Sequence, residues 1–281
     1  MSHFLLKRFS RYKNYVREKL TEITSPPVNL SKCVIHCCVQ KTGSSWFLKV
    51  FSDRLFRNSA MLRIENPDYN YIPQPEGYID RLSKINTLGA IICPLYVRPS
   101  DLKHISAPEN TRCFFVVRDP RDLVISDYFS IRYSHPLINQ WMIDKRKLLN
   151  ELSIEEGVTE RINDFRSYIS TLREWGSADS SDIKIVKFEE IFGSNQEQEF
   201  KKLMQFCEVS IDDSVVTKLL RKYSFEKVQN RSPGKGKYNH YRSGSKNQWR
   251  KYFTSKHIEL IKKQAGDLIV SLGYEENNDW E

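Results

Sequence analysis

The sequence predicts a single α/β domain with a mainly parallel central sheet flanked by helices. Apolar runs of strand length alternate along the chain with segments whose apolar residues recur at helical spacing. Chains of this kind form parallel sheets through right-handed crossovers. No linker divides the chain, which at 281 residues can bury a substantial core. The four strand-length runs are 33–39, 88–95, 112–117 and 183–188.

A basic amphipathic helix is expected at 1–26, ahead of the domain at 27–281. Residues 1–24 carry six Lys/Arg and two Glu, and Ser25-Pro-Pro-Val ends the helix. The helix can pack on the domain with its charges solvated, which we favour, or lie on an anionic membrane. Its apolar face consists of Leu5, Phe9, Tyr12, Val16, Leu20 and Ile23.

The first predicted strand runs into a short polar loop and then a helix. The unpaired amides of a helix N-terminus attract anions, and lysine and hydroxyl side chains in the loop add to that attraction. The pattern favours a phosphate or sulfate site; the alternative is an ordinary turn with a surface lysine. In the P-loop of nucleotide triphosphatases the lysine follows two glycines, whereas here it precedes the only glycine. The loop residues are Lys41, Thr42, Gly43, Ser44 and Ser45, and Trp46, Phe47, Val50, Phe51 and Leu55 form the expected helical face.

Residues 61–80 are rich in Pro, Tyr and Asn, and we expect an ordered loop over the site there, with Glu65 in it. The third predicted strand runs into Arg118-Asp-Pro-Arg-Asp, where Pro120 is typical of a helix start. Arg118 and Ser126, eight residues later, could bind one phosphate. The alternative is a structural Arg–Asp pair at the start of a helix.

Later segments predict further helices and one basic loop. Ser153 and Ser194 each begin a capping-box pattern, and Thr254 or Ser255 should cap the final helix. The helix after Ser153 should bury Ile162, Phe165, Ile169 and Leu172, and the helix after Ser194 should bury Phe200, Leu203, Met204 and Cys207. Between 230 and 244 the chain is rich in Gly, Lys, Arg and Ser, which favours a mobile basic lid.

Composition limits the classes of partner. The 44 Lys/Arg against 35 Asp/Glu give a net charge of +9, which favours a polyanionic ligand, an acidic substrate or an anionic membrane. No nucleic-acid-binding signature accompanies this charge, so we expect no nucleic acid partner. The six cysteines form no Cys-x-x-Cys pair and should be reduced and buried, as in an intracellular protein. Because we find neither an 18-residue apolar run nor a signal peptide, a cytoplasmic location is expected.

Four motifs resemble those of the sulfotransferases that use 3′-phosphoadenosine 5′-phosphosulfate (PAPS). Lys41-Thr-Gly-Ser-Ser-Trp is similar to the family's 5′-phosphosulfate loop, and Arg118 with Ser126 is similar to its 3′-phosphate motif. Tyr223-Ser224-Phe225 resembles the adenine-packing segment. Arg242-Ser-Gly followed by Trp249 resembles the phosphate clamp near the C-terminus. Because the four occur in family order over about 32–275, the chain is identified as a member of this family, with its P-loop-like fold.

The resemblance implies in-line transfer of a sulfuryl group from PAPS to an acceptor, without a metal. Lys41 would act on the leaving phosphate oxygen, which gains negative charge in the transition state. For Trp46, plain core packing is the alternative to contact with adenine. The nucleotide contacts implied are Thr42, Gly43, Ser44 and Ser45 on the 5′-phosphate, Arg118, Ser126, Arg242, Ser243 and Gly244 on the 3′-phosphate, and Trp46 and Phe225 on adenine.

The general base is the main departure from the cytosolic branch of the family. That branch has Lys-Thr-His after its second strand, whereas this chain has Cys93-Pro-Leu-Tyr96. Glu65 lies 24 residues after Lys41, at the spacing where the carbohydrate and tyrosyl-protein branches place a glutamate. Glu65 is therefore our first candidate, His135 the second and His104 the third. The alternatives are a solvated loop carboxylate for Glu65 and a turn-capping histidine for His135.

Two more departures concern the clamp, where Ser243 replaces a frequent lysine and Asn247-Gln248 replaces Gly-Asp. They imply a weaker hold on the 3′-phosphate.

The Glu65 assignment favours a carbohydrate or glycolipid acceptor. Two rival functions remain: an ATP–Mg²⁺ P-loop phosphotransferase, and a non-enzymatic basic protein that binds anionic lipid through 1–24 and 230–251.

Overall fold

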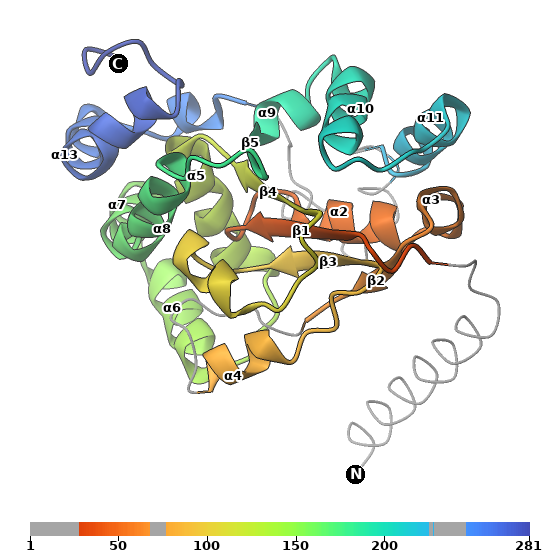
Figure 1. Cartoon of the computed structure of the whole chain (residues 1–281). Coiled ribbons are helices and arrows are strands. Elements are labelled where there is room, and N and C mark those ends of the chain that lie inside the picture. Colours follow the sequence, from red (N-terminus) through yellow and green to blue (C-terminus); the bar gives the residue numbers. More distant parts are fainter. Residues whose placement is uncertain (1–27, 68–76, 225–226, 228–245) are drawn as a thin grey trace.

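Five strands form one central sheet, all parallel, in the order β2-β3-β1-β4-β5 (Figure 1). The computed structural model describes residues 28–67, 77–224, 227 and 246–281, and the account below concerns these residues. Because β1 pairs in parallel with both β3 and β4, the carboxyl ends of the three central strands lie at one edge. The strands are β1 Cys33–Cys38, β2 Arg63–Glu65, β3 Ala90–Leu95, β4 Thr111–Val117 and β5 Ile183–Lys187.

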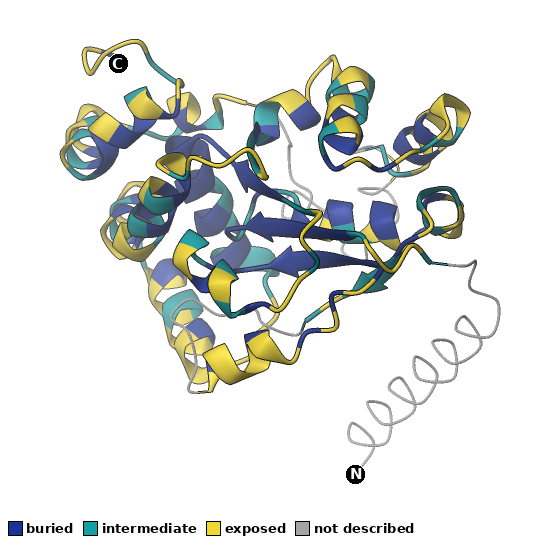
Figure 2. Cartoon of the chain, viewed as in Figure 1, coloured by how far each residue is buried: buried dark blue, intermediate teal, exposed yellow. Residues whose placement is uncertain are grey.

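Helices cover both faces of the sheet, which explains why β1 and β3 are buried along their whole length and, apart from His36, are apolar (Figure 2). Alternate residues of β1 face opposite sides: Ile35 packs with the cluster that includes α5, α7, α8 and α13, and Val34 packs with the cluster that includes α2, α10 and α11. The helices are α2 Ser44–Ser52, α3 Arg54–Ala60, α4 Tyr78–Ser83, η1 Pro99–His104, α5 Pro120–Phe129, η2 Ser130–Ser134, α6 Gln140–Glu151, α7 Ile154–Asp164, α8 Arg166–Gly176, α9 Phe188–Ile191, α10 Gln196–Phe206, α11 Asp213–Lys222, η3 Gln248–Lys251 and α13 Ser255–Ser271.

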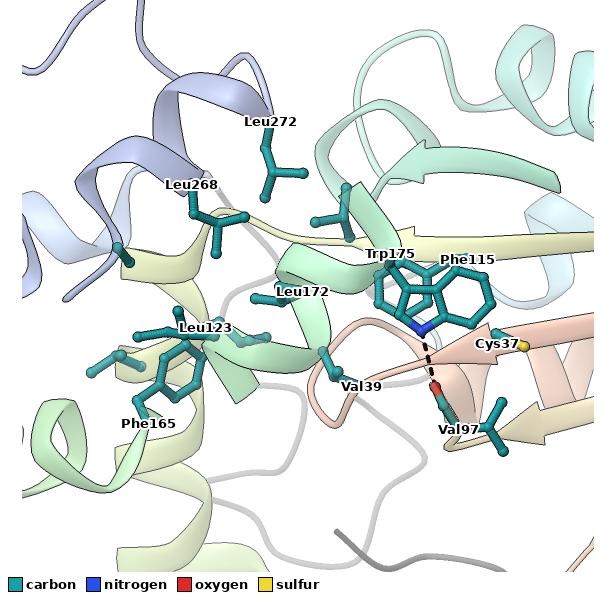
Figure 3. Packing of buried hydrophobic residues seen from close by; sticks show 14 of the residues in the cluster. Cys37, Val39, Val97, Phe115, Leu123, Phe165, Leu172, Trp175, Leu268 and Leu272 are labelled. Atoms are coloured by element: carbon teal, nitrogen blue, oxygen red, sulfur yellow. Dashed lines mark hydrogen bonds between the residues drawn. The ribbon is translucent and has the colours of Figure 1, made fainter. Parts of the chain in front are cut away.

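Trp175, one of three tryptophans in the cluster that contains Ile35, joins α8 to the sheet (Figure 3). Its indole stacks on Phe115 of β4, with ring centroids 4.6 Å apart and planes within 8°. Its Nε1 donates to the carbonyl oxygen of Val97, just after β3, at 2.9 Å. One buried side chain therefore fixes the helix layer against β4 and against the segment that follows β3.

Most predicted elements are confirmed. Each of the four strand-length runs contains a strand, and all six cysteines are free and buried. Asp119 accepts from the Arg121 amide as Pro120 opens α5. Ser153 forms its capping box with Glu156, and Thr254 is the residue that caps α13.

Four local expectations were wrong. A short edge strand, β2, lies inside the segment expected to be a loop, and it was missed because three residues are too few to show a hydrophobic pattern. The first helix ends before Asp53, whose side chain caps α3, so Leu55 is 45% exposed and lies outside the buried face. The helix expected after Ser153 is two helices that meet at the buried Phe165. Ser194 forms no capping box, because α10 begins at Gln196 without a side-chain cap.

None of the helices in the described ranges is both long and apolar enough to cross a lipid bilayer. The predictions for the 1–26 helix and for the basic lid at 230–244 lie outside the described residues. The central part of the loop expected over the site, 68–76, lies outside them as well.

Candidate functional site

The loop between β1 and α2 has an unusual backbone. Lys41 and Gly43 both have positive φ, 69° and 85°. A Cβ at Gly43 would come within 2.7 Å of the Phe192 ring, so the position requires glycine. Gly43 accepts at its carbonyl from the Trp46 and Phe47 amides and provides no side-chain cap for α2. The earlier amides of the first helical turn therefore lack intrahelical partners and can bind an anion.

Lys41 projects from this loop toward the end of α5. Its Nζ donates to Ser130 Oγ at 3.0 Å, and Ser130 is buried at the start of η2. Burial lowers the pKa of Lys41 to about 8; the nearby Asp127 carboxylate raises this pKa and the Arg118 guanidinium lowers it. The lysine is thus a partly desolvated cation, whose charge acts more strongly on an anion than a solvated one would.

Arg118 meets Lys41 at the carboxyl edge of the sheet. Its Nη1 donates to the Lys41 carbonyl oxygen at 3.1 Å, and its guanidinium lies over the Phe188 ring, 4.4 Å from the centroid. Its Nε is buried and has no hydrogen-bond partner among the described residues. A buried donor without a partner is costly, so this nitrogen is suited to receive an anionic ligand. The structure therefore brings together the two cations that the sequence assigned to opposite ends of one nucleotide.

The hydroxyl groups of the loop have different environments. Thr42 is buried and donates to the Val39 carbonyl oxygen at 2.7 Å, so its side chain holds the loop and only its amide is left for a ligand. The Ser44 hydroxyl is 2.9 Å from the Tyr96 hydroxyl. Ser45 is exposed, and Ser126, on α5, is partly exposed.

Tyr96 is a site residue that sequence reasoning missed. It follows β3 in Cys93-Pro-Leu-Tyr96, where we searched only for a histidine, and is 8% exposed. Its phenol bonds to Ser44 in the anion loop, and burial raises its pKa well above the usual value, so it stays a neutral hydroxyl. The signal available was a tyrosine at the end of the second predicted strand.

Trp46 lies at the start of α2 among aromatic rings and is 5% exposed. It makes edge contacts with Phe47, Phe192 and Phe200, at centroid distances of 5.1, 5.0 and 6.0 Å. Its Nε1 donates to the Tyr223 carbonyl oxygen at 2.8 Å. These contacts agree with core packing, and contact with adenine stays a prediction.

The structure does not bring Glu65 to Lys41. Glu65 is level with Ile92 of β3, which is level with Ile35 of β1, and β1 continues for three more residues. Two strand spacings sideways and three residues along the strand are each roughly 10 Å. The carboxylate instead pairs with Arg63, whose guanidinium also donates to the Leu88 carbonyl oxygen before β3. Glu65 would need a change of side-chain partner and position to act on a ligand at Lys41.

The two candidate histidines differ in position. The His135 amide donates to the Ser130 carbonyl oxygen at 2.7 Å, so His135 is close to the residue that contacts Lys41. Its Nδ1 is 3.0 Å from the Pro136 carbonyl oxygen, as expected of a turn-capping histidine. His104 ends η1 as the chain returns to the amino edge, where the Thr87 hydroxyl donates to the Ser106 carbonyl oxygen. Of the three candidate bases, His135 is linked most directly to Lys41.

Several predicted contacts lie outside the described residues, namely Phe225, Arg242, Ser243 and Gly244. Within the ranges that are described, no group of three or more His, Cys, Asp or Glu side chains is placed to hold a metal ion. A metal-free reaction stays a prediction.

Comparison with known proteins identifies the family. The family model "Sulfotransferase domain" matches residues 32–269, whereas the curated protein sequences contain no match. Mouse sulfotransferase SULT7A1 complexed with PAP is similar in structure, with a TM-score of 0.59, 17% identity and coverage of 88% of this chain and 89% of that chain. Retinol dehydratase in a complex with retinol and PAP has a TM-score of 0.55 and 17% identity, and the match covers 91% of this chain and 86% of that chain. Retinol dehydratase in complex with androsterone and inactive cofactor PAP has a TM-score of 0.53 and 14% identity, and the match covers 86% of this chain and 82% of that chain. These structural similarities show a shared fold, and the domain match shows that the chain belongs to the sulfotransferase family.

Proposed function

We propose that this sulfotransferase moves a sulfuryl group from PAPS to a hydroxyl or amine of a carbohydrate or glycolipid. The observation that carries the choice of donor is the hydrogen bond from Arg118 to the Lys41 carbonyl oxygen, which places two cationic residues together at the carboxyl edge of the sheet. The buried Nε of Arg118 has no partner among the described residues. A nucleotide with phosphates at both 3′ and 5′ positions could engage both cations. The structurally similar sulfotransferase and retinol dehydratase that were solved in complex with PAP agree with this choice.

The residues at this edge fit the chemistry of such a donor. The α2 amides and Lys41 would hold the 5′-phosphate, and Arg118 would hold the 3′-phosphate. PAPS would supply the sulfuryl group and a phosphate leaving group. Lys41 would stabilise the negative charge that grows on the leaving oxygen, with Ser130 orienting its ammonium group. Partial desolvation of Lys41 strengthens that interaction.

The acceptor proposal is supported by the surface beside His135. Leu137, Ile138 and Trp141, between η2 and the first turn of α6, are 48%, 52% and 48% exposed. Arg146 of α6 donates to the Ile131 carbonyl oxygen, which fixes this helix to η2 and so near Lys41. Exposed apolar residues beside an active centre suit an acceptor with a hydrophobic chain. We therefore favour a glycolipid over a free sugar.

A paired acceptor screen tests this function. Radiolabelled PAPS would be incubated with the protein and with sugars offered in pairs, each with and without an alkyl chain. We expect label transfer to a sugar, with a lower KM for the alkylated member. Transfer only to simple phenols would contradict the carbohydrate proposal. No transfer to any acceptor, together with no binding of PAP, would contradict the proposed donor.

The two rival functions have separate tests. An ATP–Mg²⁺ phosphotransferase would show a larger thermal shift with ATP–Mg²⁺ than with PAP. A lipid-binding scaffold would bind anionic liposomes in a salt-sensitive way, unaffected by PAP. A cytoplasmic location and peripheral membrane contact through residues 1–24 stay predictions.

The affinity for PAP should fall as the pH rises through about 8. The free Lys41 has a pKa of about 8, so above that pH it is largely neutral, whereas the bound phosphate favours its charged form. Binding should therefore take up protons, approaching one per nucleotide near pH 9. Calorimetry in buffers of different ionisation enthalpy measures this uptake, and Lys41→Met should abolish it. Unchanged uptake in Lys41→Met would assign the proton to another group.

Variants of the candidate bases should distinguish their roles. If Glu65 is the base, Glu65→Gln should lower turnover by about 10²-fold or more and change PAP affinity little. His135→Gln should then retain turnover. The reverse pattern would give the role to His135, in line with its link to Ser130. Measuring kcat and the Kd for PAP for both variants decides between them.

A further inference from the structure

Arg121, in the same turn as Arg118, is a buried arginine whose partners are the neighbouring Asp119 and residues from distant parts of the chain. Its Nε donates to both Asp119 carboxylate oxygens, at 2.9 and 3.2 Å, and its Nη2 donates to Asp119 Oδ2 at 2.7 Å. Its Nη1 donates to Glu275 Oε1 at 2.5 Å. Glu275 lies beyond the last helix, α13, so the C-terminal segment is bonded directly to the turn at 118–122.

Two tryptophans complete the environment of Arg121. Its guanidinium carbon is 4.3 Å from the Trp249 ring centroid and 4.5 Å from that of Trp280. The two indoles contact each other edge to face, with centroids 5.7 Å apart, and both are buried. Trp280 belongs to the segment 274–281, which we call the C-terminal tail, so this segment contacts Arg121 through both Glu275 and Trp280. A planar cation over two indole rings is held at a defined angle.

The same tail reaches the turn by a second route. The Tyr274 hydroxyl donates to Glu189 Oε2 at 2.9 Å, and Glu189 Oε1 accepts from the Asp119 amide at 3.1 Å. The backbone of Asp119 is therefore linked to the C-terminal tail through Glu189, and its side chain is linked to the tail through Arg121.

The tail is also tied to η3. The Arg250 guanidinium donates to the Glu281 carbonyl oxygen, and the Trp249 amide donates to Asp122 Oδ1 at 2.9 Å. Trp249 comes five residues after Gly244, the last residue assigned to the phosphate clamp. The tail therefore contacts both the turn that carries Arg118 and η3, the helix that follows the predicted phosphate clamp.

We propose that the C-terminal tail is a positioning element for the donor nucleotide, which sets the place of Arg118 by holding Arg121 and Asp119 in the same turn. The identity of the ligand rests on the proposed function. Arg118 donates to the Lys41 carbonyl oxygen and lies over Phe188, and the charged groups that act on it, Asp119, Asp122 and Glu189, belong to its own turn or are bonded to it. The geometry of this turn therefore decides where its unpartnered Nε points. The tail residues are positioning residues, because none of them needs to touch the nucleotide.

Trp280→Ala is the direct test. It removes one ring from Arg121 and should raise the Kd for PAP and the KM for PAPS by about 2- to 30-fold, the usual range for coupling through a neighbouring element. The kcat at saturating PAPS should be nearly unchanged, because Lys41 is not displaced. Trp280→Phe, which keeps an aromatic face, should restore most of the affinity. Amide hydrogen exchange at residues 118–122 should increase in Trp280→Ala but not in Trp280→Phe.

The matched control is Lys262→Ala. The Lys262 ammonium lies over the Trp280 ring, 4.9 Å from the centroid, and among the described residues we find no contact between Lys262 and Arg121. The loss of Lys262 should therefore leave the affinity for PAP unchanged. If Trp280→Ala does not fold, Glu275→Gln removes the ion pair between Arg121 and the tail at lower structural cost, keeps the one with Asp119, and should raise the same two constants.

The outcomes separate the two proposals. Wild-type protein that fails to bind PAP contradicts the proposed donor, and with it the ligand named here. Wild-type protein that binds PAP, with a Kd unchanged in both Trp280→Ala and Glu275→Gln, overturns the positioning role alone. A lower melting temperature with unchanged Kd would also overturn it, because the tail would then only stabilise the fold.

Discussion

Replacing Lys41 by alanine should abolish measurable sulfuryl transfer while the protein stays folded. Lys41 is the one cation in the anion loop, and its Nζ is held by Ser130 in a partly desolvated position. Removing a fixed donor that faces developing negative charge typically costs about 10²–10³ in kcat. A full charge in this position should be at the upper end of that range. Initial rates with labelled PAPS measure the effect.

Lys49→Ala is the control, because it removes the same charge from the exposed far end of the same helix, α2. Its activity should stay close to wild type. Lys41→Met, which keeps the side-chain volume, should be as inactive as Lys41→Ala. If Lys41→Met retained turnover at saturating PAPS, the lysine would contribute to binding only, and another group would have to act on the leaving oxygen.

Replacing Arg118 by alanine should weaken PAP binding by about 1.5–3 kcal/mol, the range for a hydrogen bond to a charged group. That corresponds to about 10- to 150-fold in Kd. Arg118 offers a buried Nε without a partner in the described structure, and its loss would also free the Lys41 carbonyl oxygen. The Kd for PAP, measured by calorimetry, and the melting temperature together separate lost binding from lost stability.

Arg112→Ala is the matched control for this variant. Arg112 lies on the same strand, β4, at its amino end, where it pairs with Asp182 and Glu208. We expect its PAP affinity to equal that of wild type. Equal affinity in Arg118→Ala and Arg112→Ala would remove Arg118 from the 3′-phosphate site and leave it as a structural partner of the loop.

Much of the fold could be predicted because buried parallel strands and capped helices leave strong local patterns. The runs at 33–39 and 88–95 contain strands buried on both faces, so nearly every residue is apolar. Ser153 and Pro120 begin helices through local capping chemistry that depends on few neighbours. The three-residue edge strand β2 and the break at Asp53 were missed because a strand partner and a single cap decide them.

The position of the anion loop was also evident in the sequence. A strand, a lysine, a glycine and hydroxyl residues in succession specify backbone geometry within a few residues, and Gly43 indeed has the positive φ that the loop requires. The position of Arg118 was evident as well, because it is the residue directly after β4. The parallel neighbours β1 and β4 end at the same edge of the sheet, so the residues that follow them lie close together.

The order of the strands, and with it the neighbours of each site residue, came from the tertiary structure. Glu65 has the right spacing from Lys41 along the chain, yet it lies two strands away and pairs with Arg63. Ser130 shows no distinctive pattern and Tyr96 shows only its place after a strand, yet they contact Lys41 and Ser44, respectively. Spacing along a chain records which residues share a turn or a strand. Contacts between residues tens of positions apart depend on how whole helices and strands pack, and no single segment of the sequence determines that packing.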